Sequence, residues 1–225
     1  EYSLLVIGGG GISDKPPTFD DDEAKIARMV ANATKFVVAV LFQVPNEPLF
    51  GGKNEDEIIA YTYDKYLKGE GEEWPLLMPM VKSAVRAMDA VQAVAKSKYN
   101  QDIQNFVLTG GSKRGWTTWL TAASGDPRVK GIVPVVIDML DMPVQMERQI
   151  ACYGAYSEQI KDYTDLKFQE RLNSPEGKKL ISIVDPFAYR DALTLPKLVL
   201  LGTNDPYWTV DAASVYFPEL LGEKH

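Results

Sequence analysis

The chain is 225 residues long, with 45% hydrophobic and 24% charged residues, which is the composition of an ordinary globular domain. Its formal net charge of −7 argues against a nucleic-acid partner, since binding to phosphate groups needs a basic face. No apolar run reaches membrane-spanning length, and the single cysteine, Cys152, excludes an intrachain disulfide.

Strands and helices are predicted to alternate along the chain. Short apolar and β-branched runs bounded by glycine or proline are typical of buried strands, and longer stretches with apolar residues every three or four positions are typical of helices. The predicted strands cover residues 3–7, 36–42, 106–109, 132–138 and 197–202. The predicted helices cover residues 20–33, 55–67, 75–98, 116–123 and 210–221. This order predicts a doubly wound, mostly parallel α/β sheet.

A stretch of mixed polarity, residues 139–195, lies between the last two predicted strands and contains several tyrosines. We expect it to form inserted helices, at a place where a lid commonly sits, within one domain that spans residues 1–225. The first strand begins at Ser3 and the last helix ends just before the chain does, so we expect the sheet to be truncated at both ends.

The segment from Gly110 to Gly115, between the third strand and the next helix, is the main functional signal. Strand, glycine-flanked serine and helix is the arrangement that holds a nucleophile on a sharp turn above a parallel sheet. It predicts Ser112 as a nucleophile; the alternative is a serine that caps the helix. The pattern departs from G-x-S-x-G, since Arg114 stands where the second glycine would be.

Two further groups are expected around Ser112. Gly9, Gly10 and Gly11 follow the first strand and, with the backbone N–H of Lys113, are predicted to form an oxyanion hole. Alternatives for these glycines are a plain turn or a dinucleotide-binding loop, although no helix begins directly at them.

Two acids compete for the role of orienting a histidine. Asp205 follows the end of the last predicted strand, where a triad acid is expected. Asp138, at the end of the preceding strand, is the rival, and a turn aspartate before proline is the simplest alternative for Asp205.

Candidate substrate-pocket residues are Arg114, Asp138, Tyr156 and Trp208. A cation after the nucleophile stabilises developing negative charge or attracts a carboxylate, and aromatic side chains line pockets, although each also fits ordinary packing or solvation. The acidic run at residues 20–23 lacks the spacing of a calcium loop. We predict no metal and no cofactor.

A serine nucleophile needs a histidine base, and the only histidine is the last residue, His225. Triad histidines lie on the loop after the last strand, so we do not expect His225 to act as the base. The sequence predicts hydrolase architecture with weak or absent turnover by this chain.

Residues 109–120 resemble the signature of the PhoPQ-activated pathogenicity-related family, an α/β-hydrolase branch, and the resemblance extends through residues 126–129, 135–140, 153–160 and 204–208. It implies an α/β-hydrolase fold with Ser112 as nucleophile and Asp205 as acid. It also implies a histidine after one further strand beyond Lys224, a small-molecule or peptide ester or amide as substrate, and a secreted or periplasmic location. The family includes a secreted eukaryotic repressor of cell proliferation, so a non-catalytic signalling or interaction protein is the alternative.

Overall fold

The computed structural model describes residues 1–225 and is built around a four-stranded parallel sheet in the order β2-β1-β3-β4. The strands are β1 (Tyr2–Ile7), β2 (Val37–Leu41), β3 (Asn105–Gly111) and β4 (Val129–Val135). Because the strands are parallel, their carboxyl ends meet at one edge of the sheet, and the loops that follow them lie together there.

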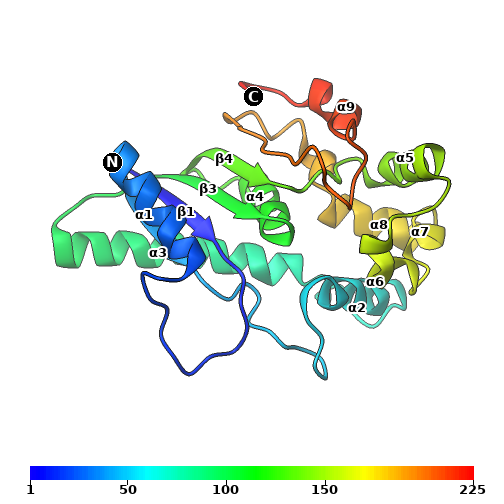
Figure 1. Cartoon of the computed structure of the whole chain (residues 1–225), viewed down its shortest axis with the longest axis horizontal. Helices are drawn as coiled ribbons and strands as arrows, with labels where there is room; N and C mark the ends of the chain where they lie inside the picture. Colours follow the sequence, from blue (N-terminus) through cyan, green and yellow to red (C-terminus); the bar gives the residue numbers. More distant parts are fainter.

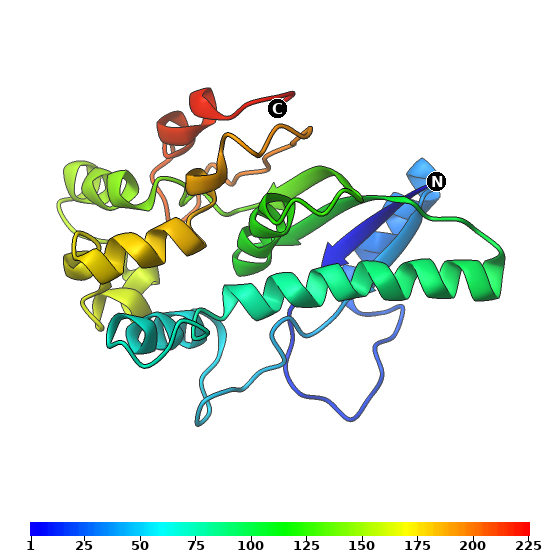
Figure 2. The same cartoon turned by 180° about the vertical axis from the view of Figure 1, so that it is seen from behind.

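Helices cover both faces of this sheet. α1 (Asp22–Thr34) lies on one face, and α3 (Leu77–Tyr99) and α4 (Lys113–Ala123) lie on the other (Figures 1 and 2). This arrangement confirms the predicted doubly wound fold.

α4 is the most buried helix of the molecule. Every residue from Lys113 to Ala122 is buried, and Trp119 is 0% exposed. Its buried threonines donate their hydroxyls to carbonyls four residues back, as Thr117 does to Lys113 O (2.9 Å). The apolar residues Met80 and Met88 of α3 are buried with α4 in the same core.

The remaining helices gather at one end of the molecule, beyond the carboxyl ends of the strands (Figure 1). They are α2 (Glu55–Leu67), α5 (Met142–Tyr153), α6 (Lys161–Thr164), α7 (Phe168–Arg171), α8 (Pro175–Val184) and the short α9 (Ala213–Tyr216). None of the helices combines the length and the apolarity needed to cross a lipid bilayer.

Three predicted elements differ most from the structure. β4 lies three residues earlier than expected, because Val136 adopts φ +44° and ends the strand. The segment 197–200 pairs with β4 in parallel only through isolated bridges at Lys197 and Leu200. The helix expected over 210–221 is broken into α9 and a 3₁₀ turn at Phe217–Glu219, since Pro218 cannot continue an α-helix.

Candidate active site

Ser112 occupies the sharp turn between β3 and α4. Its backbone has φ +53° and ψ −127°, an unfavourable conformation for a residue with a side chain. Two hydrogen bonds hold it there: its N–H donates to Val135 O (2.9 Å) and its C=O accepts from the Trp116 N–H (3.0 Å). Such strain is typical of a nucleophile held at the end of a strand.

Two glycines make this turn sterically feasible. A Cβ on Gly110 would lie 2.7 Å from Arg114 O, and one on Gly115 would lie 2.8 Å from Ile137 Cγ2 and 2.9 Å from Gly110 O. The first turn of α4 therefore comes closest to β3 at Gly115. This explains how the turn tolerates Arg114 where the general pattern has glycine.

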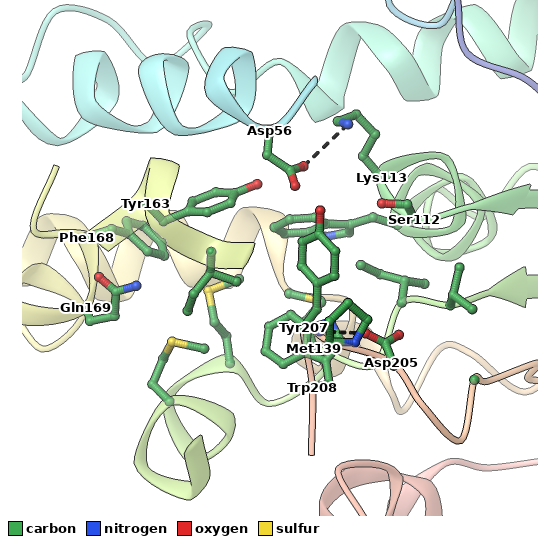
Figure 3. A pocket seen from close by; sticks show the side chains of 18 of the residues that line it. Asp56, Ser112, Lys113, Met139, Tyr163, Phe168, Gln169, Asp205, Tyr207 and Trp208 are labelled. Atoms are coloured by element: carbon green, nitrogen blue, oxygen red, sulfur yellow. Dashed lines mark hydrogen bonds and ion pairs between the residues drawn. The ribbon is translucent and has the colours of Figure 1, made fainter. Parts of the chain in front are cut away.

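Ser112 opens into a pocket of about 390 Å³ (Figure 3). Polar groups gather at the Ser112 end, and apolar side chains from the insertion make up most of the rest. The lining residues are Asp56, Ser112, Lys113, Trp116, Val136, Ile137, Met139, Met142, Met146, Ile160, Tyr163, Phe168, Gln169, Gly202, Asn204, Asp205, Pro206, Tyr207 and Trp208.

Of the two candidate acids, Asp205 shares this pocket with Ser112 and Asp138 does not. Asp205 follows the segment that pairs with β4, and its Oδ1 accepts the Tyr207 N–H (2.7 Å). Asp138 is 5% exposed. Burial, reinforced by the negative charge of Asp205, raises the pKa of Asp138 to about 6.

The two cations after Ser112 are buried and paired with acids. Lys113 Nζ forms ion pairs with Glu55 and, at 3.4 Å, with Asp56, both at the start of α2. Burial alone would raise the pKa of Glu55, but hydrogen bonds from Arg114 and Lys113 outweigh it and hold that pKa at about 2. These acids compensate the unfavourable placement of two cations in the first turn of a helix.

Arg114 lies outside the Ser112 pocket, so its guanidinium is not one of the groups that line it. Its Nε donates to Val44 O (2.6 Å), and its terminal nitrogens contact Glu55 (3.0 Å) and Glu47 (3.4 Å). A Cβ on Gly9 would lie 2.7 Å from the Arg114 Cζ. Arg114 thus packs between the loop after β1 and the loop after β2.

The glycine loop runs beside the end of β3. β1 pairs with β3 as far as Ile7 opposite Gly110, so the loop continues next to the Ser112 turn. Gly9 carbonyl accepts from Gln43 N (2.8 Å), and Gly11 carbonyl accepts from Gln43 Nε2 (2.9 Å). Gly9 and Gly10 line a separate groove, whereas Lys113 lines the Ser112 pocket.

Among the aromatic candidates, Trp208 lines the pocket and Tyr156 packs against the core outside it. The hydroxyls of Tyr163 and Tyr207 point toward Asp56 (Figure 3). The sequence did not single out Asp56 or Gln169. Met142 and Met146 are four positions apart on α5, a spacing that ordinary core packing explains equally well.

His225 lies away from this site. Its Nε2 is 3.2 Å from Glu223 Oε1, its side chain is 68% exposed, and its backbone pairs with Lys197 and Val199. It is not among the residues that line the pocket. No group of three or more His, Cys, Asp or Glu side chains is arranged to hold a metal ion.

Parallel strands, helices on both faces and a strained serine between strand and helix define an α/β-hydrolase fold. Solved structures support this class. The acetyl xylan esterase of Paenibacillus sp. R4 is similar with a TM-score of 0.63 at 14% identity, covering 99% of this chain and 66% of that one. Acetyl xylan esterase 1 of Thermoanaerobacterium sp. has a TM-score of 0.58 at 13% identity, and the match covers 100% of this chain and 67% of that one. An acylaminoacyl peptidase of Pyrococcus horikoshii has a TM-score of 0.54 at 12% identity, and the match covers 99% of this chain and 31% of that one.

The chain belongs to the PhoPQ-activated pathogenicity-related protein family, whose model matches residues 1–225. It is 36% identical over 231 residues to autocrine proliferation repressor protein A of Dictyostelium discoideum. That match covers 99% of this chain and 46% of the relative, so the chain spans about half the length of the curated relative.

Proposed function

We propose that this chain supplies the nucleophile, the acid and the oxyanion hole of a serine hydrolase that cleaves an ester or amide bond. The observation that carries the proposal is the strained Ser112, which opens into the same pocket as Asp205. Ser112 Oγ attacks the carbonyl carbon of a small-molecule or peptide substrate. Asp205 orients and charge-balances the histidine that takes the serine proton.

The oxyanion is assigned to backbone donors. The first N–H groups of a helix have no partner within it, and the N-terminal end of the helix favours negative charge. The Lys113 N–H, at the start of α4, supplies one donor. The loop Gly9–Gly11 is assigned the second, because it runs beside the Ser112 turn, although Gly9 and Gly10 line the neighbouring groove. Because the Lys113 and Arg114 side chains are paired with acids, the backbone N–H rather than either cation holds the oxyanion.

The base is assigned to a histidine outside these 225 residues. His225 is exposed and paired with Glu223, and no imidazole lines the pocket. Without a base the serine is a weak nucleophile, and only residual catalysis from binding and the oxyanion hole remains. We therefore expect the 225-residue chain to hydrolyse generic esters poorly.

Hydrolysis of p-nitrophenyl acetate tests these roles in the full-length protein and in the 225-residue chain. In the full-length protein, Ser112→Ala should remove the enzymatic rate and Asp205→Asn should lower kcat by about 10³–10⁴-fold. Asp138→Asn is the matched control and should leave the rate nearly unchanged. A robust Ser112-dependent rate in the 225-residue chain would contradict the assignment of the base outside it.

A second candidate is a non-catalytic signalling or interaction protein on the same scaffold. Its support is the 36% identity to a protein named as a proliferation repressor. A secreted or periplasmic location belongs to either proposal and rests on family membership alone. A fluorophosphonate probe that leaves Ser112 unlabelled in the full-length protein would favour this candidate.

A further inference from the structure

Among the side chains that line the Ser112 pocket, one has a buried polar atom without a hydrogen-bond partner. Gln169, on α7, is 9% exposed, and its Nε2 is buried without a hydrogen-bond acceptor. Its amide lines the pocket at the end opposite Ser112, with the nitrogen turned toward the interior (Figure 3). A buried donor without an acceptor is unfavourable in the free protein, and an acceptor atom of a ligand in the cavity would relieve that cost.

The other two buried glutamines contrast with Gln169. Gln145 Nε2 donates to Leu140 O (3.1 Å) and to Ala212 O (3.0 Å). Gln149 Nε2 donates to Tyr207 O (2.9 Å), and its Oε1 accepts the Ser157 N–H (2.8 Å). Both sit on α5 and tie it to neighbouring loops. The amide that faces the cavity is the one left unpaired.

Between Ser112 and Gln169 the pocket is apolar. Its walls there include Met139, Met142, Met146, Ile160, Phe168 and Trp208. Methionine side chains are unbranched and adapt to different apolar shapes. A ligand that extends from Ser112 toward Gln169 thus crosses apolar surface and meets a hydrogen-bond donor at the far end.

The size of the pocket sets the size of that ligand. A pocket of about 390 Å³ is many times the space that one water molecule needs, so it has room for an extended ligand. An acetyl group on Ser112 would leave most of this space empty and would not reach Gln169.

We propose that this pocket selects acyl groups with an apolar body and a distal carbonyl oxygen, which accepts a hydrogen bond from Gln169 Nε2. The proposal rests on the proposed function, since Ser112 defines the reacting end. Gln169 acts as a specificity residue, because it contacts the substrate away from the reacting atoms.

The test compares matched pairs of p-nitrophenyl esters in the full-length protein. One member of each pair carries a methyl ketone at its far end (4-oxopentanoate, 5-oxohexanoate, 6-oxoheptanoate), and the other is the plain acyl ester of the same length. For the best-fitting length, kcat/KM should favour the keto ester by about tenfold. Gln169→Leu should remove this preference, so that the keto ester and the plain ester of each length have the same kcat/KM. Equal rates within every pair would overturn the proposal.

A binding measurement separates failure of this inference from failure of the proposed function. Calorimetry on Ser112→Ala protein with ethyl 5-oxohexanoate and ethyl hexanoate, extended to the other two lengths, reports recognition without turnover. Tighter binding of a keto ester that Gln169→Leu abolishes supports the inference even if Ser112 is not a nucleophile. No preference at any length contradicts it even in an active enzyme.

Thermal unfolding supplies a matched control for Gln169→Leu itself. This substitution removes an unpaired amide and should leave Tm unchanged or raised. Gln145→Leu removes two satisfied hydrogen bonds of a buried glutamine and should lower Tm by several degrees. A similar fall for Gln169→Leu would mean that its amide has a structural partner, which would contradict the inference.

Discussion

Two buried carboxyl groups near the candidate site, Asp138 and Asp185, have pKa values raised to about 6, chiefly by burial. Their partners differ. Asp185 accepts backbone N–H groups from Met142 (2.8 Å), Phe187 (2.9 Å) and Asp141 (3.3 Å). Asp138 Oδ1 has no hydrogen-bond partner. Asp185 therefore has a structural role, whereas the charge of Asp138 is only partly compensated, because Tyr216 and the backbone of Ala213 lower its pKa less than burial raises it.

This difference predicts that Asp138→Asn stabilises the protein near neutral pH. The pKa of Asp138 is 3.8 in the unfolded chain and about 6 in the folded protein. The raised pKa therefore contributes fully to the free energy of unfolding below pH 3.8, and this contribution is lost as the pH rises through about 6. Asparagine does not ionise and avoids the loss. The free energy of unfolding at pH 7.5 should increase by up to about 3 kcal/mol. Urea unfolding from pH 3.5 to pH 7.5 measures the effect, which should vanish at the acidic end.

Asp185→Asn is the matched control. Both carboxylate oxygens of Asp185 accept N–H groups, and an amide nitrogen cannot replace either acceptor. This variant should be destabilised across the same pH range. If Asp138→Asn is instead destabilised equally at every pH, the interaction of Asp138 with Tyr216 outweighs the cost of burying its charge.

Single residues also mark the limit of sequence-based prediction. Ser112 and Asp205 were expected around one site, and the structure brings both to one pocket. The environment of Lys113 and Arg114 was not predictable from local sequence, because their acidic partners Glu55 and Glu47 lie 58 to 67 positions earlier in the chain. Helix periodicity carries no information about such pairing. The position of Gln169 in the pocket was not predictable either, because it also depends on tertiary packing.

At the scale of elements, the contact between α4 and the sheet depends on small residues. α4 begins directly after the strained Ser112, and Gly115 lets its first turn pass the ends of β3 and β4. The helix and strands were predicted in the right order, but β4 was placed three residues late. Val136 itself is neither glycine nor proline, so its residue type does not predict the positive φ that ends the strand.

Gly115→Ala tests this contact. The new Cβ would lie within 2.9 Å of Gly110 O, Val135 O and Ile137 Cγ2, so helix and sheet have to separate. Overpacking of this kind costs about 1–3 kcal/mol, and each kcal/mol lowers Tm by about 2–4 °C in a protein of this size. Calorimetry should therefore show a clear fall in Tm.

Gly111→Ala is the neighbouring control. A Cβ on Gly111 meets no atom within 4 Å, and its φ does not require glycine. Its effect on the free energy of unfolding should stay within about 0.5 kcal/mol. Equal losses of stability for both variants would show that the glycines act through strand conformation instead of close packing.

At the scale of the whole molecule, the pocket is assembled from segments that are distant in sequence. Asp56 lies in the first turn of α2, and Ser112 directly follows β3. Gln169 comes from the helices between β4 and residue 197, and Asp205 follows the segment beside β4. The order of strands and helices predicted that Ser112 and Asp205 would meet, because both follow strand ends of one parallel sheet. It did not predict how the inserted helices close the apolar side of the pocket, since that depends on tertiary packing.

The central claim is that Ser112 is a nucleophile poised in this pocket, and labelling with a fluorophosphonate probe tests it most directly. In the full-length protein, mass spectrometry of the labelled tryptic peptide should show stoichiometric modification at Ser112, absent in Ser112→Ala and strongly slowed in Asp205→Asn. Asp138→Asn should label at the normal rate. A full-length protein that remains unlabelled at Ser112, while correctly folded, would contradict the account.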